Sequence, residues 1–484
     1  MSETNSKLFR FLDRFSLFTG IIGCISLTLS ISVSQSMFVL ALLSLLIVKL
    51  LSRSVGPSPS LSKYSTGFTK LLVAGLLLYA SWLLSAVLHS ISSMSIQPIT
   101  ALLKSDFKDV WLMFVAVWVY HHSSHTEHRK LVLRAIAIGF LIVILTGLVS
   151  AFSPYRLSKL LYHMKHGWEF SAAARLQHPM LTLPFGITLY MPVGMLGTHL
   201  AFGAQLGFAI VPLLLFTIDR YIQKPWFRGW SLADWSVLFL LAVAGIVFGL
   251  TNARSAVLGV LSALLVGVVF LTYRKWQKKV LRLAWVPFLV IAGFVLLIVN
   301  DSSRDFLMQS FGFEQKHSDY QRIMLWSSAI EVAAKNPVFG VGPGMFSDAV
   351  VNQMNALSKD RPYLWYLFMQ VERGHAHNDL LHHLVTGGVV SALLFLYFWS
   401  RVLFLCLGST LSKFAGGGAR LADRILAEFA PFVVFAPLIL LIGGLFQCYL
   451  LDDQVLLPFW LMVGLTAVAS KSDFNYNELG NDYV

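Results

Sequence analysis

The sequence predicts an all-α, polytopic membrane protein with about 12 transmembrane helices. Of its 484 residues, 56% are hydrophobic and only 13% are charged, whereas about a quarter of the residues in an average soluble domain are charged. Apolar runs recur almost from one end of the chain to the other, and basic residues alternate between the segments that join them. We therefore predict one polytopic membrane domain over residues 1–484.

Apolar runs of about 17 to 25 residues can cross the hydrocarbon core of a bilayer as helices. None has Asp, Glu, Lys or Arg near its middle, which argues against a coupled transporter because such proteins hold their ions there. The first two runs are separated by "SVSQS" (32–36). The predicted spans are 16–33, 36–51, 69–89, 107–122, 132–152, 197–218, 232–250, 255–273, 283–300, 380–403, 429–448 and 454–470.

The distribution of basic residues predicts that both termini lie in the cytoplasm. If the N-terminus is inside, the inside segments hold 23 of the 37 Lys and Arg residues, and 7 of the other 14 lie in the single long segment 301–376. Cytoplasmic loops carry an excess of Lys and Arg, so this orientation explains most of the net charge of +13 and no nucleic-acid partner is expected. Membrane orientation does not explain the seven basic residues in the shorter outside segments: Lys104, Lys108, Arg156, Lys159, Lys165, Arg175 and Arg254.

Two outside segments are longer than a simple connection requires. Segment 153–196 begins with apolar residues at helical spacing and basic residues off that stripe, which predicts an amphipathic helix at the interface. Its second half, "HPMLTLPFGITLYMPVG", contains three prolines and is expected to be re-entrant or to lie on the surface. The two halves together predict a periplasmic amphipathic and re-entrant segment over 153–196.

The other long segment, 301–376, is predicted to be a folded periplasmic loop with helices. "SDYQRIMLWSSAIEVAAKNP" (318–337) has a Ser/Asp cap, a helical pattern and an Asn-Pro stop. The turn "GVGPG" (340–344) lacks the spacing and the Lys-Ser/Thr ending of a phosphate loop, so it is expected to be a tight turn. A second helix is predicted from Met345 to Leu357, and the loop is expected to pack over the membrane domain.

Histidines concentrate in "RGHAHNDLLHHL" (373–384), where the long loop enters a predicted span. Histidine can take or give a proton near neutral pH, and Asn378 is a good N-cap for the following helix. Polar decoration of an interfacial helix start is the simpler alternative. A metal site is another, but only Asp379 and His383 share a helical face there, and a third ligand would have to come from elsewhere.

Arg254 lies in "GLTNARSAVLGV", between two predicted spans that are separated by only a few residues. Its guanidinium is expected at the outer membrane surface, where it suits bidentate contacts with phosphate oxygens. The alternative is an interfacial arginine that extends to lipid headgroups. Arg322, in the first turn of the loop helix, is a weaker candidate because a solvated helix face explains it equally well.

Three stretches resemble the O-antigen ligase and polymerase superfamily of bacterial envelopes. They are "LTNARSAVLG", "RIMLWSSAIEVAAKNPVFGVGPGMF" and "HAHNDLLHHLVTGGVVS", and they span about 250–392. The first departs mildly from the family pattern, because Ala253, Arg254 and Ser255 stand where the family often has Ser-Arg-Gly; the arginine is kept. The resemblance implies a membrane fold of the C-type glycosyltransferases and transfer that inverts the sugar configuration without a metal or cofactor.

The resemblance also implies substrates and residue roles. The donor would be a glycan on undecaprenyl diphosphate, and the acceptor would be the lipid A core sugar, met at the periplasmic face of the bacterial inner membrane. By motif position, Arg254 and Arg322 would hold the diphosphate, and His377 would deprotonate or steer the acceptor hydroxyl, with His375 in support. These roles agree with the residue chemistry, because a diphosphate leaving group needs positive charge and a sugar hydroxyl needs a base.

Two more arginines, Arg373 and Arg175, are candidate substrate contacts. The motifs do not separate a ligase from an O-antigen polymerase, which would extend the glycan on its lipid carrier. A protein-directed oligosaccharyltransferase is disfavoured because the chain ends 14 residues after its last predicted span. A membrane solute transporter is the alternative from a different class.

Overall fold

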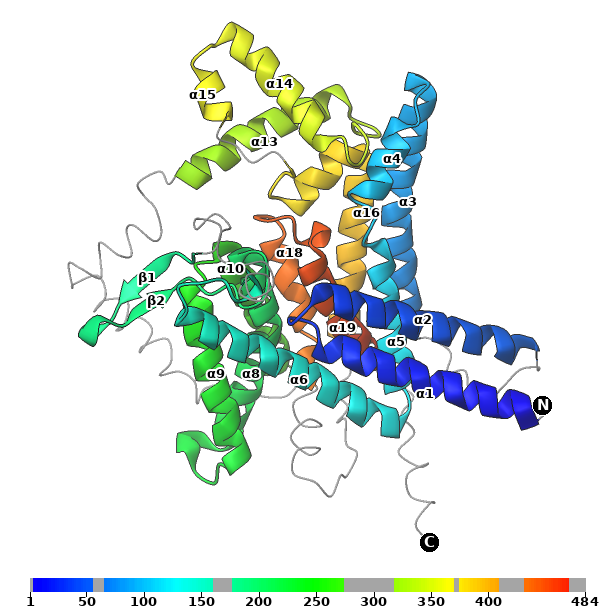
Figure 1. The fold of residues 1–484 in the computed structure, drawn as a ribbon, viewed down its shortest axis with the longest axis vertical. Coiled ribbons are helices and arrows are strands. Elements are labelled where there is room, and N and C mark those ends of the chain that lie inside the picture. Colours follow the sequence, from blue (N-terminus) through cyan, green and yellow to red (C-terminus); the bar gives the residue numbers. More distant parts are fainter. Residues whose placement is uncertain are drawn as a thin grey trace.

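The computed structural model describes residues 3–54, 65–159, 176–273, 317–369, 374–408 and 431–469. Within these ranges the regular secondary structure is helical apart from one two-stranded antiparallel sheet (Figure 1). The predicted all-α, polytopic membrane architecture is confirmed. The apolar patterning produces it because a helix satisfies all of its backbone hydrogen bonds within one segment, as the interior of a bilayer requires.

Seven helices in the described part of the chain are long and apolar enough to cross a membrane. Shorter apolar helices occupy Val110–Ser123, Pro431–Gly443 and Asp453–Ala469. The predicted span 283–300 lies outside the described residues. The seven are α2 (Ile31–Ser54), α3 (Thr66–Ser93), α6 (Thr126–Ala151), α8 (His199–Gln223), α9 (Leu232–Leu250), α10 (Arg254–Leu271) and α16 (Asp379–Gly408).

The sequence placed the break between the first two helices incorrectly. Helix α1 covers Glu3–Ile25 and α2 begins at Ile31, so "SVSQS" lies inside α2. The serines of this stretch do not interrupt the helix. The hydroxyl of Ser34 donates a hydrogen bond to Gly23 O of α1 at 2.7 Å, so it does not compete for the backbone of α2. Helix α1 is not one of the seven candidate spans, since charged residues occupy its first half.

The predicted span 429–448 is also wrong at its C-terminal end. The helix there ends at Gly443, and α19 (Asp453–Ala469) follows after a turn at 444–452. The turn is apolar for much of its length, but local turn bonds and a few bonds to other elements replace the helical ladder. One such bond runs from Asp379 N, at the start of α16, to Gly444 O at 2.6 Å.

The long loop contains α13 (His317–Lys335), α14 (Phe346–Asp360) and α15 (Leu364–Phe368), which cap one end of the bundle (Figure 1). Helix α13 ends immediately before Asn336-Pro337, as the stop signal predicts. The three helices have a hydrophobic core of their own that includes Leu325, Phe346 and Met354. Ala376, Val385 and Cys448 belong to the same core, so the loop packs onto the start of α16 and the 444–452 turn.

The glycine turn fastens α13 to a kink in α16. Gly388 interrupts α16 with φ 68°, and this frees carbonyls one turn earlier. Val341 N donates to Val385 O at 2.8 Å, and Gly342 N donates to Thr386 O at 3.0 Å. The predicted tight turn is confirmed by the positive φ angles of its three glycines, 64° at Gly340, 94° at Gly342 and 75° at Gly344.

The described part of segment 153–196 contains a β-hairpin that the sequence did not predict. Strand β1 (Pro179–Thr182) pairs antiparallel with β2 (Thr188–Tyr190), and Phe185 at the tip is fully exposed. Gln177 anchors the base through bonds from Nε2 to three backbone carbonyls at 2.9–3.1 Å. Most of the predicted amphipathic helix, 160–175, lies outside the described residues.

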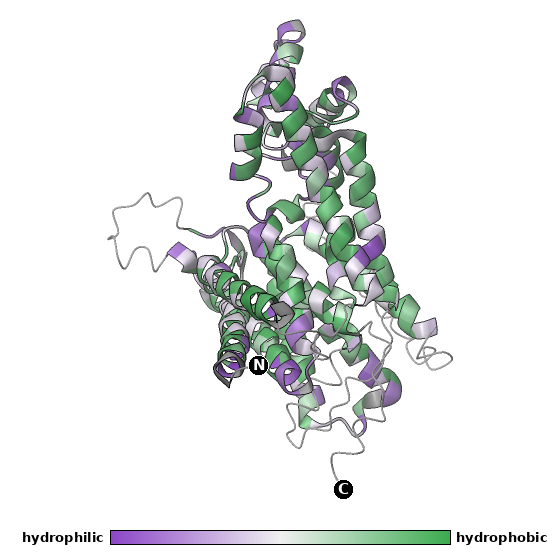
Figure 2. Cartoon of the chain, turned by 90° about the vertical axis from the view of Figure 1, so that its right-hand side faces the viewer, coloured by the Kyte–Doolittle hydropathy of each residue, from purple (hydrophilic) through white to green (hydrophobic). Residues whose placement is uncertain are grey.

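The helices of the bundle are mostly hydrophobic along their length and hydrophilic mainly at their ends (Figure 2). Large side chains such as Phe239 and Leu265 are 67% and 66% exposed on α9 and α10. A soluble protein rarely exposes so much contiguous apolar area. Acyl chains of a bilayer would cover these faces.

Candidate functional site

The candidate site is built around the loop Gly374–Asn378, which leads into α16. Asn378 Oδ1 accepts a hydrogen bond from Leu381 N at 2.9 Å, so the predicted N-cap is confirmed. His377 has φ 49°, a left-handed conformation that is uncommon for a residue other than glycine. Ala376 is fully buried between the two histidines. The cap and the burial of Ala376 therefore fix this loop, and the left-handed backbone at His377 changes the direction of the chain there.

The imidazole of His377 is oriented by Gln447. Nδ1 of His377 lies 2.7 Å from Oε1 of Gln447. With the amide oxygen facing the ring, Nδ1 is the donor, and in the neutral imidazole the lone pair then lies on Nε2. That tautomer makes Nε2 the basic atom of His377.

His375 supports the same turn. Its Nδ1 accepts a hydrogen bond from the backbone N of His377 at 3.3 Å, and the two rings meet edge to face with centroids 4.3 Å apart. Burial, with the nearby charges of His377 and His382, lowers the pKa of His375 to about 3. His375 therefore stays neutral near neutral pH and acts as an acceptor for the backbone.

Helix α13 is joined directly to the histidine loop. Trp326 Nε1 donates to Ala376 O at 2.7 Å. Arg322 lies four residues earlier on the same face of the helix. Its positive charge also acts on Tyr449, whose pKa is raised mainly by burial. Arg322 therefore lies on the side of α13 that faces the histidine loop and the 444–452 turn.

The start of α10 reaches the same turn. Arg254 is the first residue of this helix, and the hydroxyls of Ser255 and Tyr449 lie 2.8 Å apart. A side chain on Gly259 would meet Ile439 O, so α10 packs against the 431–443 helix at backbone contact distance. This close packing holds Arg254 at the end of the bundle where the histidine loop lies.

The 444–452 turn is the element that sequence analysis missed. Gln447 contacts His377, Tyr449 contacts Ser255, and Leu450 N donates to the carboxylate of Asp379 at 3.3 Å. Three separate segments are thus tied together through one short stretch. The sequence contains an indication of this turn. The otherwise apolar run is interrupted by polar residues at Gln447, Tyr449 and Asp452.

The later histidines of the motif pack inside the protein. His383 stacks on Trp82 with centroids 4.5 Å apart, and its Nδ1 lies 3.1 Å from Ser391 Oγ. His382 Nε2 lies 3.8 Å from Asp106, whose carboxylate accepts from Gly344 N at 2.8 Å. Asp106 thus anchors the glycine turn. Among the described residues, the group that could hold a metal ion includes neither Asp379 nor His383.

Two of the predicted contacts, Arg175 and Arg373, lie outside the described residues. Arg156, which membrane orientation left unexplained, is described: its Nη1 lies 3.5 Å from Gly197 O. Gly197 N in turn bonds to Oε1 of Gln454, just beyond the 444–452 turn. Arg156 therefore brings a further positive charge to this end of the bundle.

Residues 237–396 match the family model described as O-antigen ligase. This segment of the chain is similar to the O-antigen ligase family. The matched segment is about a third of the chain and contains Arg254, Arg322, His375 and His377. No curated protein matches the chain.

The family match and the helices long enough to span a membrane support a membrane glycosyltransferase of the O-antigen ligase or polymerase type. The site combines an oriented imidazole with arginines from two helices. A base of this kind can accept a proton from a hydroxyl, and guanidinium groups can stabilise a phosphate leaving group.

Proposed function

We propose that the protein transfers a glycan from undecaprenyl diphosphate to the core sugar of lipid A, at the periplasmic face of the bacterial inner membrane. The proposal rests chiefly on one observation, the 2.7 Å contact that orients His377 through Gln447. It prepares an unprotonated Nε2 on a loop that also bonds to the helix carrying Arg322. The proposed topology has both termini in the cytoplasm.

In this proposal Arg254 and Arg322 bind the diphosphate of the donor. Arg254 opens α10, where the partial positive charge of a helix N-terminus adds to that of the guanidinium. As the glycosidic bond to phosphate breaks, negative charge builds on the leaving oxygen. Two arginines can stabilise it without a metal ion. Arg156 is a third cation near this end, and Arg175 and Arg373 remain candidates for acceptor or donor phosphates.

His377 acts on the acceptor. The hydroxyl oxygen of the acceptor sugar attacks the anomeric carbon, and Nε2 of His377 takes the hydroxyl proton. The bond from the anomeric carbon to the phosphate oxygen breaks, and its electron pair leaves on undecaprenyl diphosphate. Attack from the face opposite the leaving group inverts the anomeric configuration. His375 keeps the turn in place, with its pKa too low for it to compete for that proton.

The test is glycan transfer with purified full-length protein, an undecaprenyl-diphosphate glycan and rough lipopolysaccharide, in EDTA. We expect ligation to the lipid A core by the wild type. His377→Ala and Arg322→Ala should lose it, by about 10² to 10⁴-fold for the base. Both variants must elute as the folded protein does on size exclusion.

The alternative products are distinguishable in the same assay. A donor glycan that lengthens on its lipid carrier, with no product on lipid A, identifies a polymerase. Absence of any covalent product with the wild type contradicts glycosyl transfer and favours a solute transporter.

A further inference from the structure

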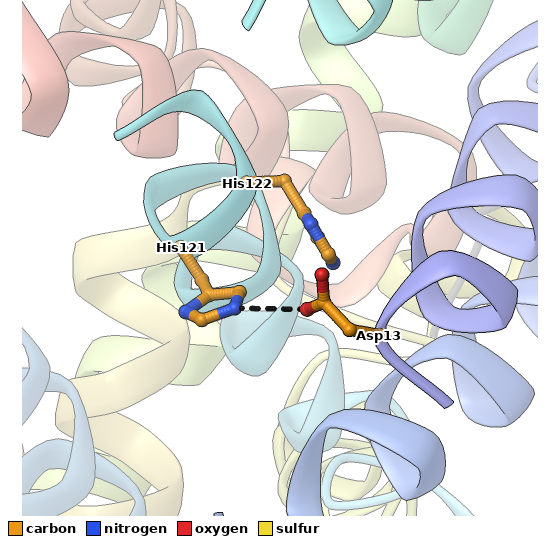
Figure 3. A group of neighbouring side chains, drawn as sticks. All are labelled: Asp13, His121 and His122. Atoms are coloured by element: carbon orange, nitrogen blue, oxygen red, sulfur yellow. Dashed lines mark hydrogen bonds and ion pairs between the residues drawn. The ribbon is translucent and has the colours of Figure 1, made fainter. Parts of the chain in front are cut away.

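A second cluster of histidines lies at the other end of the membrane domain. Helix α5 (Met113–Ser123) ends with His121 and His122, and α6 begins beside His125 and His128. Asp13 of α1 faces this end of α5, and Figure 3 shows its carboxylate between the two imidazoles of α5. The ligand atoms of Asp13, His121 and His122 all lie within 4.8 Å of one another.

The cluster is remote from the candidate transfer site. Tyr120, beside His121, bonds to Ser65 at the start of α3. Ser85, near the end of α3, bonds instead to Phe339 O beside the glycine turn. Ser65 and Ser85 are twenty residues apart along this helix, which corresponds to about 30 Å. On the predicted topology the cluster faces the cytoplasm.

The distance between His121 and Asp13 fits a pair of metal ligands as well as it fits a long hydrogen bond. His121 Nε2 lies 3.4 Å from Asp13 Oδ1, which is longer than an ordinary N–H···O bond. Two ligands of one tetrahedral zinc ion, each about 2.1 Å from it, are about 3.4 Å apart. The observed separation therefore matches a pair of ligands around one ion.

The surroundings of His122 leave one ring nitrogen available. Ser16 Oγ donates to Ala41 O at 2.8 Å, so it can only accept from His122 Nε2, which lies 3.2 Å away. The lone pair of His122 is then on Nδ1, which faces Nδ1 of His128 at 3.5 Å. A metal-bound histidine commonly donates its other N–H to a nearby acceptor, and Ser16 supplies that acceptor here.

We propose that Asp13, His121 and His122 bind a divalent transition-metal ion, with zinc the best match and His128 the nearest fourth donor. One carboxylate with two or three imidazoles is a ligand set that zinc accepts. The ion would join α1, α5 and the start of α6. This proposal departs from the sequence-based expectation of no metal, and it is independent of the proposed transfer reaction.

The experiment uses the full-length protein in detergent, purified through a tag without histidines. After treatment with a chelator, Zn²⁺ is added back, its stoichiometry is measured by elemental analysis and its affinity by titration. Co²⁺ serves as a second probe, because its visible absorption reports tetrahedral coordination. We expect one tightly bound ion per chain and a higher unfolding temperature with Zn²⁺ than without it.

The decisive variants are Asp13→Asn and His121→Gln, whose side chains are 23% and 12% exposed and can be changed without opening the core. Each should weaken Zn²⁺ binding at least about tenfold and abolish the tetrahedral Co²⁺ spectrum. His178→Gln, in the exposed part of the hairpin segment, is the matched control and should bind as the wild type does. Equal unfolding temperatures of the metal-free proteins show that the variants are folded.

The proposal is overturned if the wild type binds no more Zn²⁺ than the Asp13→Asn variant, or if all three variants bind equally. Transfer activity is measured on the same samples. Chelation should lower thermal stability and leave the initial rate of glycan transfer within about twofold, because the two sites lie at opposite ends of the domain.

Discussion

Nδ1 of His377 and Oε1 of Gln447 lie 2.7 Å apart although 70 residues separate them in the chain. One residue belongs to the loop that opens α16, and the other belongs to a turn between two short apolar helices. Their contact sets which nitrogen of the imidazole can act as a base. It also makes Gln447 a positioning residue in the proposed reaction.

The first prediction concerns this pair. Gln447→Met removes the acceptor at nearly constant volume, so His377 loses its preferred tautomer, and we expect a fall in kcat of about 10- to 100-fold. Gln447→Glu keeps an acceptor and should retain most of the rate. Its carboxylate would favour protonated His377, so the acid limb of the pH–rate profile should move to higher pH. Equal loss in both variants, with unchanged profiles, would contradict a positioning role.

The second prediction concerns the arginines. Arg254→Lys and Arg322→Lys keep the charge but lose the planar fork that contacts phosphate oxygens in pairs. We expect each to lower kcat/KM for the lipid-linked donor by about 10- to 100-fold. Arg401→Lys, at the other end of α16 and packed on Phe404, is the control. The measurement is steady-state kinetics at varied concentrations of the lipid-linked donor. A defect only in the KM for the acceptor would show that these arginines do not bind the diphosphate.

The third prediction concerns the turn that fastens α13 to α16. In Gly340→Ala the new methyl group would meet Val385 O at a backbone with φ 64°, which should destabilise the protein by about 1–3 kcal/mol. Gly229→Ala is matched in φ, at 71°, but has open space around it, so it should cost only about 1 kcal/mol. Thermal unfolding measures both effects.

Activity separates the two glycine variants further. Gly340→Ala should also lower transfer, because α13 carries Arg322 and bonds to the histidine loop. Gly229→Ala should transfer at the wild-type rate after correction for the folded fraction. Loss of stability without loss of activity in Gly340→Ala would show that docking of α13 does not position the site.

The fourth prediction concerns pH and His375. Its pKa in the folded protein is about 3, whereas the unfolded chain takes up a proton near pH 6.5. The unfolded state therefore binds more protons between these values, and stability falls as the pH drops from about 6.5 toward 3. His375→Gln should make this decline of the unfolding temperature shallower, as measured in detergent from pH 7.5 to 5.

A comparison with the wild type is needed because other groups titrate in the same range. Burial and the charges of Asp453 and Asp109 raise the pKa of Asp452 to about 6, so its effect on stability has the opposite sign. An identical pH dependence in wild type and His375→Gln would show that His375 is not held neutral by the fold. His178→Gln controls for the loss of a histidine as such.

Much of the candidate site could be predicted from local sequence. The end of α13 at Asn-Pro, the glycine turn and the Asn378 cap follow from steric limits and hydrogen bonds within a few residues. The apolar runs likewise predict a membrane fold, because the bilayer imposes the same demand on every span. The roles of Arg254, Arg322 and His377 came from the resemblance to a known family and not from these local rules.

Other features depended on contacts between distant segments. The turn at 444–452 and the break after Ile25 interrupt apolar runs, and hydropathy does not distinguish a helix from a turn whose polar groups bond elsewhere in the fold. The histidines of α5 gave no metal pattern on their own element, since Asp13 comes from α1.

By itself, therefore, the sequence determined the membrane class, the helical loop and the chemical types of the candidate residues. Only the tertiary structure decided that Gln447 orients His377, that Tyr449 meets the start of α10, and that Asp13 completes the second histidine cluster. Capping, turns and hydrophobic periodicity act over a few residues and are visible in the chain. Side-chain partners from separate helices are selected by packing, which local sequence does not encode.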